Sequence, residues 1–319
     1  MRRQSRRRRQ SSAAPAVMFL IGFAVVLIYS MGVAGIGPDL ITSFRYVAEG
    51  SGEGHTAEWV GIPGLESVGR PDAHELEQGA AQKTYPYVLW GDTGSVDIDL
   101  YAGVNDYLSS NRPGYYGEDQ EYYLAYINDN VQREYLLGLV DCIKAETTNA
   151  DARARIAISL VQHIPYDYAG MFDISGNMRY PYQALYDGEG VCSEKTLLAA
   201  FLLREMGYGV ALLEFPSESH MALGVKAPAQ YTYKDTGYAF VEMTVPSIIT
   251  DSDGEYMGVG KLTSNPRVYP VSDGKALGTL VADEYRDAQE YHAILAKGFV
   301  LDLPDYQRWQ ILTGKYGIY

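Results

Sequence analysis

Cysteine and histidine are scarce in this chain, which has two cysteines and five histidines among its 319 residues. The cysteines, Cys142 and Cys192, do not form a Cys-x-x-Cys pair, and the histidines are scattered along the sequence. A zinc site needs several such residues at close spacing. An acidic run at residues 251–255 lacks the third spaced ligand and the distal glutamate of a calcium-binding EF-hand loop. The sequence therefore predicts no metal and no cofactor.

Acidic residues are absent from the first 37 positions, which contain six arginines, all before residue 10. Residues 13–36 carry no charge, and as a helix they span about 36 Å, enough to cross a hydrocarbon core of about 30 Å. This pattern predicts a cytoplasmic tail at residues 1–12, a transmembrane helix at residues 13–37 in the cell membrane, and an extracytoplasmic body. A cleaved signal peptide ending near Ala34 is the alternative, but the apolar run exceeds the usual length of about 7–15 residues.

Basic residues are in the minority beyond this segment. The whole chain has 26 Lys and Arg against 40 Asp and Glu, and its formal net charge is −14. The body after residue 37 is more acidic still, because the six arginines precede it. Nucleic-acid binding needs a basic surface that neutralises phosphates. The composition therefore argues against nucleic acid as a partner, whereas residues 13–37 predict the lipid bilayer as one.

Changes in composition and periodicity divide the chain into segments. The residues after the transmembrane stretch are rich in Gly, Glu and Ser, which is typical of a flexible linker. No internal repeats are found in the remainder. The predicted segments are a basic tail (1–12), a transmembrane helix (13–37), a juxtamembrane linker (38–80), an N-terminal subdomain (81–150), a central core (151–260) and a C-terminal extension packed on the core (261–319).

The two outer segments of the body have their own element patterns. In the N-terminal subdomain, residues 84–90 and 95–102 predict a strand pair around a four-residue turn, and one long helix is predicted from Glu118 to Glu146. The elements predicted for the C-terminal extension are a strand near 267–271, a helix near 283–296 and an aromatic tail.

One stretch near the middle of the chain brings a cysteine to the start of a helix. Gly188 and Gly190 form a turn, Cys192 follows, and helix formers continue to Gly207, which suits a left-handed helix cap. At a helix N-terminus the unpaired N–H groups and the macrodipole favour a thiolate, which is a nucleophile. The alternatives are an inert buried cysteine and, in an exported body, a disulfide with Cys142.

The residues that follow this helix predict a small antiparallel sheet. Apolar strand patterns occur at residues 210–215, 220–226 and 238–244. In a symmetrical hairpin His220 lies close to Glu242, and the two side chains share one face of the sheet, which is predicted to be open. A helix-terminal cysteine, a strand histidine and a cross-strand carboxylate are the parts of a nucleophile–base–orienter triad. Asp235, in the hairpin loop, is the alternative orienter.

The order Gly-x-Cys, helix, Gly-Tyr, strand, His, strand and carboxylate-x-Thr resembles the transglutaminase-like superfamily within the papain-like cysteine enzymes. The resemblance begins at the helix predicted for residues 152–163, continues through Ile164-Pro165-Tyr166-Asp167, and covers roughly residues 150–250. It implies an α+β fold in which the helix that bears the cysteine packs on an antiparallel sheet that bears the histidine and the acid.

The resemblance also implies roles for single residues. The family's nucleophile falls on Cys192, its general base on His220, and its acidic member on Glu242, where the family usually has aspartate. Papain-like enzymes place a donor side chain upstream of the nucleophile, so Gln183 is the candidate to stabilise an oxyanion together with the backbone N–H of Cys192. Gln183 is otherwise interpreted as a surface residue.

Together these roles predict a membrane-anchored, extracytoplasmic cysteine enzyme that transfers an acyl group from an amide or peptide bond through a thioester. Hydrolysis of a protein or peptide at the cell surface is favoured, because water is always present and no site for an acceptor lysine is evident. Two alternatives stay open: a cross-linking transglutaminase, and a non-catalytic surface module that uses the same fold for binding or as a structural part.

Overall fold

The computed structural model describes residues 71–172, 177–256, 259–298 and 300–318. The predicted transmembrane helix at residues 13–37 and most of the predicted linker lie outside these ranges. Within them, no helix is long and apolar enough to cross a bilayer. The described residues belong to one unit, Val68–Tyr319, in which helices are combined with antiparallel sheets. The α+β class is therefore confirmed.

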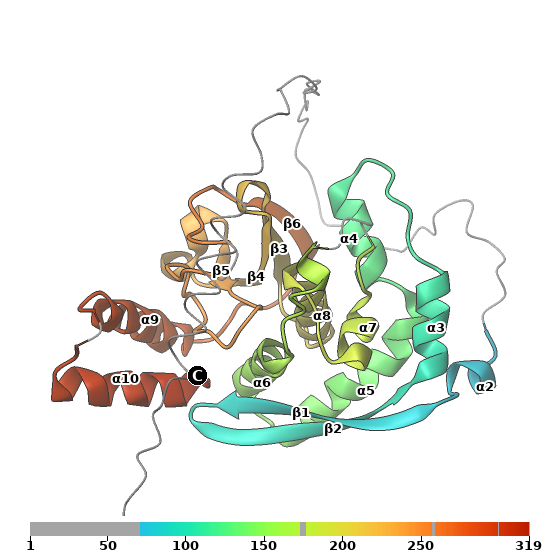
Figure 1. The fold of residues 1–319 in the computed structure, drawn as a ribbon, viewed down its shortest axis with the longest axis horizontal. Coiled ribbons are helices and arrows are strands. Elements are labelled where there is room, and N and C mark those ends of the chain that lie inside the picture. Colours follow the sequence, from blue (N-terminus) through green and yellow to red (C-terminus); the bar gives the residue numbers. More distant parts are fainter. Residues whose placement is uncertain (1–70, 173–176, 257–258, 299, 319) are drawn as a thin grey trace, which may run out of the picture. The chain divides into compact units, whose positions relative to one another are not determined.

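Helices and strands alternate irregularly along the chain (Figure 1). The helices are α2 (Ala73–Leu76), α3 (Ala102–Ser110), α4 (Asp119–Ile127), α5 (Asn130–Glu146), α6 (Ala150–His163), α7 (Pro181–Asp187), α8 (Cys192–Glu205), α9 (Val281–Leu295) and α10 (Leu303–Tyr316). The strands are β1 (Ala80–Leu89), β2 (Asp92–Tyr101), β3 (Val210–Phe215), β4 (His220–Lys226), β5 (Tyr238–Val241) and β6 (Arg267–Ser272).

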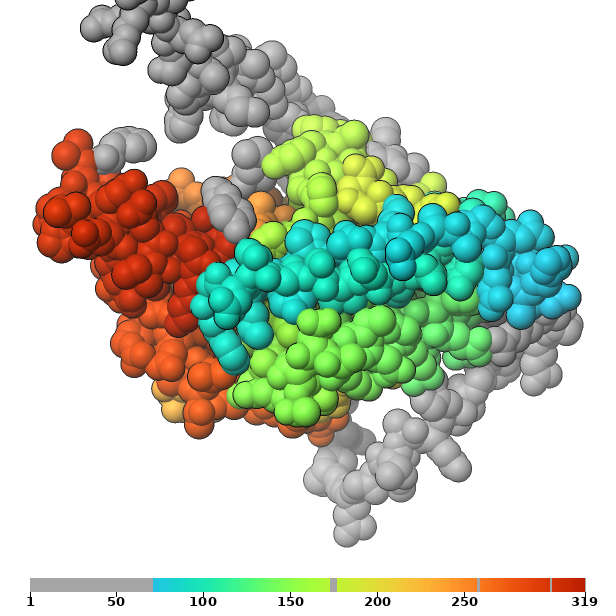
Figure 2. Space-filling view, turned by 90° about the horizontal axis from the view of Figure 1, so that it is seen from below, coloured from blue at the N-terminus to red at the C-terminus, as the bar shows by residue number. Residues whose placement is uncertain are grey.

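The strands β1 and β2 form the predicted hairpin, but they are longer than predicted and the turn is tighter. Leu89 pairs with Asp92, so the loop consists of Trp90 and Gly91 alone. Both loop residues have positive φ, 54° and 97°, as in the type I′ turns whose twist suits a hairpin. The hairpin lies beneath α5 and α6 (Figure 1), and it crosses one face of the molecule as a continuous band (Figure 2).

The prediction of one long helix from Glu118 to Glu146 is wrong, because the structure has two helices there, α4 and α5. The side chain of Asp129 accepts a hydrogen bond of 2.9 Å from the N–H of Gln132 and so caps the second helix. Asp and Asn compete with helix continuation because their side chains bond to nearby backbone groups. The run Asn128-Asp129-Asn130 is therefore the physical cause of the break.

The larger sheet has the antiparallel order β5-β4-β3-β6. Strands β4 and β5 pair in the register of the expected symmetrical hairpin, with Leu223 opposite Val241. Helix α8 lies against one face of this sheet (Figure 1), where its buried Leu197 and Phe201 share a core with Met221 and Leu223 of the sheet. The cysteine-bearing helix therefore packs on the sheet.

The opposite face of the sheet is covered, so the prediction that the face bearing His220 is open is wrong. Phe215, Ala222 and Phe240 are fully buried there in a second hydrophobic cluster with Leu262. The chain that follows β5 folds back over this face and contributes Tyr256 to the cluster. These covering residues have no regular apolar period, and hence the sequence did not indicate the cover.

The C-terminal helix α9 contacts the core through a buried ion pair. Arg155 of α6 donates two hydrogen bonds of 2.6 Å to the carboxylate of Glu284 on α9, and both side chains are almost completely buried. Helix α9 agrees with the sequence prediction, whereas α10 was predicted only as an aromatic tail. Its start is capped by Asp302, whose carboxylate accepts from the N–H of Asp305 at 2.9 Å.

Candidate active site

Cys192 is the first residue of α8, and the turn before it is fixed by hydrogen bonds to an earlier segment of the chain. Gly188 ends α7 in a left-handed conformation, with φ 76°. Gly190 then pairs with Tyr166: the N–H of Gly190 donates to the carbonyl of Pro165, and the N–H of Asp167 donates to the carbonyl of Gly190, both at 3.2 Å. This bridge fixes the approach to the helix, so the half-buried thiol lies at the helix N-terminus as predicted.

The structure brings His220 and Glu242 together. Nε2 of His220 lies 2.9 Å from Oε2 of Glu242, and neither side chain is exposed to solvent. His220 is the first residue of β4, and Glu242 follows the last residue of β5. The hairpin register places them diagonally across the strand pair, on one face of the sheet.

The other carboxylate oxygen of Glu242 is held by the backbone. Oε1 accepts hydrogen bonds from the N–H of Met243 at 3.0 Å, from the N–H of Thr244 at 2.8 Å and from the hydroxyl of Thr244 at 2.7 Å. Burial acts to raise the pKa of Glu242, but the charge and hydrogen bond of His220 and the Thr244 donors outweigh it and lower the pKa. Glu242 is therefore a fixed, ionised carboxylate that accepts a hydrogen bond from Nε2 of the imidazole.

The second ring nitrogen of His220, Nδ1, is buried. Among the described residues Nδ1 has no hydrogen-bond partner, and the neighbouring Cys192 thiol contributes to the pKa of the ring. Burial acts to lower the pKa of His220, but the charge of Glu242 and the contact with Cys192 raise it to about 10. An imidazolium between a carboxylate and a thiol is the arrangement that stabilises a thiolate.

Two further residues complete this group, and sequence reasoning did not assign either a role. Lys195 is fully buried one turn after Cys192, and its Nζ donates to the carbonyls of Gln162 (3.1 Å), Ile164 (2.6 Å) and Thr244 (2.8 Å). Burial lowers the pKa of Lys195 to about 7, and the charge of Glu242 opposes this shift. The sequence could have indicated this position, because Lys195 lies three residues after Cys192 on a buried helix and residues with that spacing are neighbours.

Tyr166 is the second of these residues. Burial and the sulfur of Cys192 raise the pKa of Tyr166, whereas hydrogen bonding from the backbone N–H of Cys192 lowers it. The phenol therefore lies beside both the nucleophile and the N–H group that begins α8. The sequence motif containing Tyr166 was noted, but nothing in it indicated which way the side chain points.

The other two candidates lie elsewhere. Gln183 caps α7 with its Oε1, and its Nε2 donates to Asn105 (3.2 Å) and Ser109 (2.8 Å) of α3, so its donor group is engaged away from the cysteine. The interpretation of Gln183 as a surface residue is wrong, since it is 3% exposed. Asp235 is exposed in the loop between β4 and β5. The geometry therefore favours Glu242 over Asp235 as the partner of His220.

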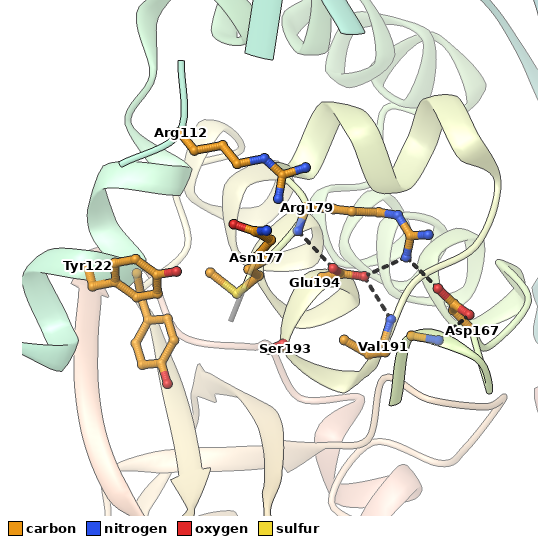
Figure 3. A pocket seen from close by; sticks show the side chains of 11 residues that line it. Arg112, Tyr122, Asp167, Asn177, Arg179, Val191, Ser193 and Glu194 are labelled. Atoms are coloured by element: carbon orange, nitrogen blue, oxygen red, sulfur yellow. Dashed lines mark hydrogen bonds and ion pairs between the residues drawn. The ribbon is translucent and has the colours of Figure 1, made fainter. Parts of the chain in front are cut away.

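A cleft of about 460 Å³ lies at the start of α8 (Figure 3). Its lining includes Val191 and Ser193, which flank Cys192, and the exposed Arg112 from the loop before α4. Arg179 forms one wall, where it donates to Asp167 (2.7 Å) and Glu194 (3.2 Å). Glu194 also accepts from the N–H of Val191 at 3.0 Å, so the wall of the cleft is bonded directly to the residue before the cysteine.

Cys142 and Cys192 are both free thiols, and no disulfide joins them. Cys142 lies half-buried on α5, packed against the main core. Within the described ranges, no group of three or more His, Cys, Asp or Glu side chains is arranged to hold a metal ion. Cys192, His220 and Glu242 supply the site with a thiol, an imidazole and a carboxylate.

Comparisons with known proteins found no family model or curated protein that matches, and only weak similarities to solved structures. Two solved structures of LapG from Legionella pneumophila are similar to it, each with a TM-score of 0.27. The EGTA-treated form is 14% identical and the match covers 60% of this chain and 92% of LapG; the other is 16% identical over 53% and 92%. These are weak similarities in fold alone.

Proposed function

We propose that the chain is a cysteine enzyme that transfers an acyl group from an amide or peptide bond through a thioester on Cys192. One observation carries the proposal: His220 is hydrogen-bonded to Glu242 through Nε2, and its Nδ1 is left for the thiol of Cys192 at the start of α8. A nucleophile, a base and an orienter in this order form the working part of a catalytic triad.

The proposed reaction has two halves. The Cys192 thiolate attacks the carbonyl carbon, the C–N bond breaks, and the His220 imidazolium gives its Nδ1 proton to the leaving amine. Water then adds to the thioester while His220 takes up one of its protons, the C–S bond breaks, and the acid is released. Throughout, Glu242 holds the proton on Nε2, so that Nδ1 is the atom that exchanges protons.

In this proposal the oxyanion replaces the phenol oxygen of Tyr166 as the acceptor of the backbone N–H of Cys192, and the hydroxyl of Tyr166 donates to it. Both groups lie at the start of α8, where the helix dipole also favours negative charge. Tyr166 takes the role that the sequence prediction gave to Gln183. The neighbouring cleft, with Arg112 and Arg179 on its walls, is the proposed place for the rest of a polypeptide substrate.

Hydrolysis is the proposed outcome, with cross-linking as the alternative, because water needs no acceptor site of its own. The proposed location is outside the cytoplasm, on a chain anchored by residues 13–37. This part rests on the arginine bias of the sequence alone.

Alkylation by iodoacetamide tests the proposal without knowledge of the substrate. At pH 6.5 we expect Cys192 to react at least about 10-fold faster than Cys142, because His220 stabilises the thiolate while an ordinary thiol has a pKa of about 8.5. In His220→Asn the advantage disappears. Mass spectrometry of the two cysteine peptides gives both rates in one sample. Equal rates at the two cysteines, unchanged in His220→Asn, would instead favour a non-catalytic binding module.

Tyr166→Phe separates the oxyanion role from thiol reactivity. We expect acylation of Cys192 by p-nitrophenyl acetate to fall by about 10²-fold, which is typical of the loss of one oxyanion donor. Alkylation by iodoacetamide is expected to stay within about 3-fold, because that displacement develops no oxyanion. The two rates are compared by nitrophenolate release and by mass spectrometry. Faster acylation in Tyr166→Phe contradicts the assignment and identifies the phenol as a group that blocks the site.

A further inference from the structure

The ring of Tyr256 lies flat on the imidazole of His220. The two ring centroids are 5.5 Å apart and the planes differ by 11°, which is a stacked arrangement. Phe215 lies 6.4 Å from the same imidazole, and Phe240 lies 6.4 Å from Tyr256. His220 therefore has aromatic neighbours, and Tyr256 belongs to the hydrophobic cluster that covers this face of the sheet.

Tyr256 is held in place by its own loop. Its N–H donates to the carbonyl of Gly260 at 3.0 Å, and the N–H of Gly260 donates back to the carbonyl of Tyr256 at 2.8 Å. The phenol donates to the backbone carbonyl of Asp251 at 3.4 Å. Burial raises the pKa of Tyr256, and nearby carboxylates, Glu242 first and Asp251 next, raise it further, so the phenol stays neutral.

Asp251 in turn is fixed by the C-terminal extension. Oδ1 of its carboxylate lies 2.5 Å from Nε2 of His292 on α9, and Asp251 is 6% exposed. The same oxygen accepts from the N–H of Asp253 at 3.2 Å. Hydrogen bonding to Asp251 raises the pKa of His292. The contacts thus run without interruption from α9 through Asp251 and Tyr256 to the imidazole.

A ring stacked on the imidazole has two physical effects. It limits rotation of the ring about its Cβ–Cγ bond, which keeps Nδ1 directed at the thiol. It also keeps water from the hydrogen bond between His220 and Glu242, and a charge pair is stronger where the local dielectric is low. The stronger attraction to Glu242 opposes the lowering of the pKa of His220 by burial, and so favours the imidazolium and the thiolate of Cys192.

We propose that Tyr256 is a positioning residue for the imidazole of His220, and that the pair His292–Asp251 holds Tyr256 there from α9. This assigns a task to the C-terminal extension: it supports the face of the active site that lies away from the cleft. The inference rests on the proposed role of His220, but it makes a separate claim about which residues maintain that role.

The test uses the full chain with Cys142→Ser, so that iodoacetamide reports on Cys192 alone. Alkylation rates are measured from pH 5 to pH 10 for the variants Tyr256→Ala, Tyr256→Phe and His292→Ala. We expect Tyr256→Ala to react about 10-fold more slowly at pH 6.5, and its profile to approach that of an ordinary thiol. Tyr256→Phe, which keeps the stacked ring but loses the hydrogen bond to Asp251, is expected to react about 3-fold more slowly than the parent.

His292→Ala is expected to change the rate in the same direction as Tyr256→Ala, by about 3-fold or more, since Asp251 loses its partner. Gln289→Ala, at an exposed position on the same helix, is the matched control and leaves the profile unchanged. Circular dichroism checks that each variant is folded. An unchanged profile in Tyr256→Ala, or equal losses in the Phe and Ala variants, overturns the proposal for Tyr256. An unchanged profile in His292→Ala overturns the part assigned to α9.

Failure of the proposed function gives a different result. In that case the parent protein itself shows the profile of an ordinary thiol, and His220→Asn leaves it unaltered. That result rejects the proposed function, and with it the role given to Tyr256. If the parent profile does depend on His220, the Tyr256 and His292 variants decide the positioning proposal.

Discussion

Glu242→Gln is expected to reduce turnover by up to about 10⁴-fold while the chain stays folded. The amide is nearly isosteric with the carboxylate, and its oxygen can still accept from the N–H groups of Met243 and Thr244. Its NH₂ group then donates to Nε2 of His220, which places the imidazole proton on Nδ1. That tautomer points a proton at the thiol, so it cannot accept the proton of Cys192.

Glu242→Gln is also expected to change the pH dependence of Cys192 alkylation. The pKa of His220 is raised from 6.5 to about 10, because the charge of Glu242 and the contact with Cys192 outweigh burial. The imidazolium therefore persists through neutral pH, and its stabilising contribution, fully present below pH 6.5, is lost as the pH rises through about 10. Without the carboxylate charge, burial dominates and the pKa of His220 falls. Without the imidazolium at neutral pH the Cys192 thiol loses its proton less readily, so rapid alkylation of Cys192 should then require higher pH than in the parent.

Asp235→Asn is the matched control, because it makes the same chemical change at the exposed loop carboxylate. It is expected to leave turnover and the pH profile of Cys192 alkylation unchanged, whereas Cys192→Ala abolishes turnover. Turnover is measured as hydrolysis of p-nitrophenyl acetate beyond the first acylation. An active Glu242→Gln together with an inactive Asp235→Asn would falsify the assignment of the orienter.

Elements with a strict local pattern could be predicted from the sequence. The bounds of β3 and β4 match the apolar runs at 210–215 and 220–226, because Pro216 and the turn after it end one strand and begin the next. The register of β4 with β5 followed from the length of their loop. Helix α10 could not be recognised in the same way, since its outer face carries exposed Leu303 and Ile311 and its apolar stripe is not one-sided.

The residues of the candidate site can also be divided into those that a local sequence pattern predicts and those that it does not. Cys192, His220 and Glu242 stand at the ends of regular elements, so turn signals and strand parity were enough to bring them together. Tyr256 and Gln183 depend on contacts across distant parts of the chain. Gln183 bonds to Asn105, 78 residues earlier, and Tyr256 reaches His220 from an irregular loop. No local period encodes such contacts, because they are set by how the elements pack.

Lys195→Met is expected to destabilise the fold by about 2–5 kcal/mol, although Lys195 is no part of the reaction. The carbonyls of Gln162, Ile164 and Thr244 lose their common donor, and each buried acceptor left unpaired costs about 1–3 kcal/mol. Relief of the cost of burying the ammonium offsets part of this loss. Urea denaturation followed by circular dichroism measures the change, and Lys144→Met, at a partly exposed position on α5, is expected to alter stability by at most about 0.5 kcal/mol.

The pH dependence of this deficit gives a second, independent test of Lys195. Burial lowers the pKa of Lys195 from 10.5 to about 7, so between these values the unfolded chain binds more protons at this residue than the folded chain. Its contribution to the free energy of unfolding therefore rises with pH over that window. The methionine variant lacks this slope, so its deficit relative to the parent should be larger at pH 9 than at pH 6. A deficit that is the same at pH 6 and pH 9 would mean that Lys195 stays protonated, with its three carbonyl partners and the charge of Glu242 outweighing the cost of burial.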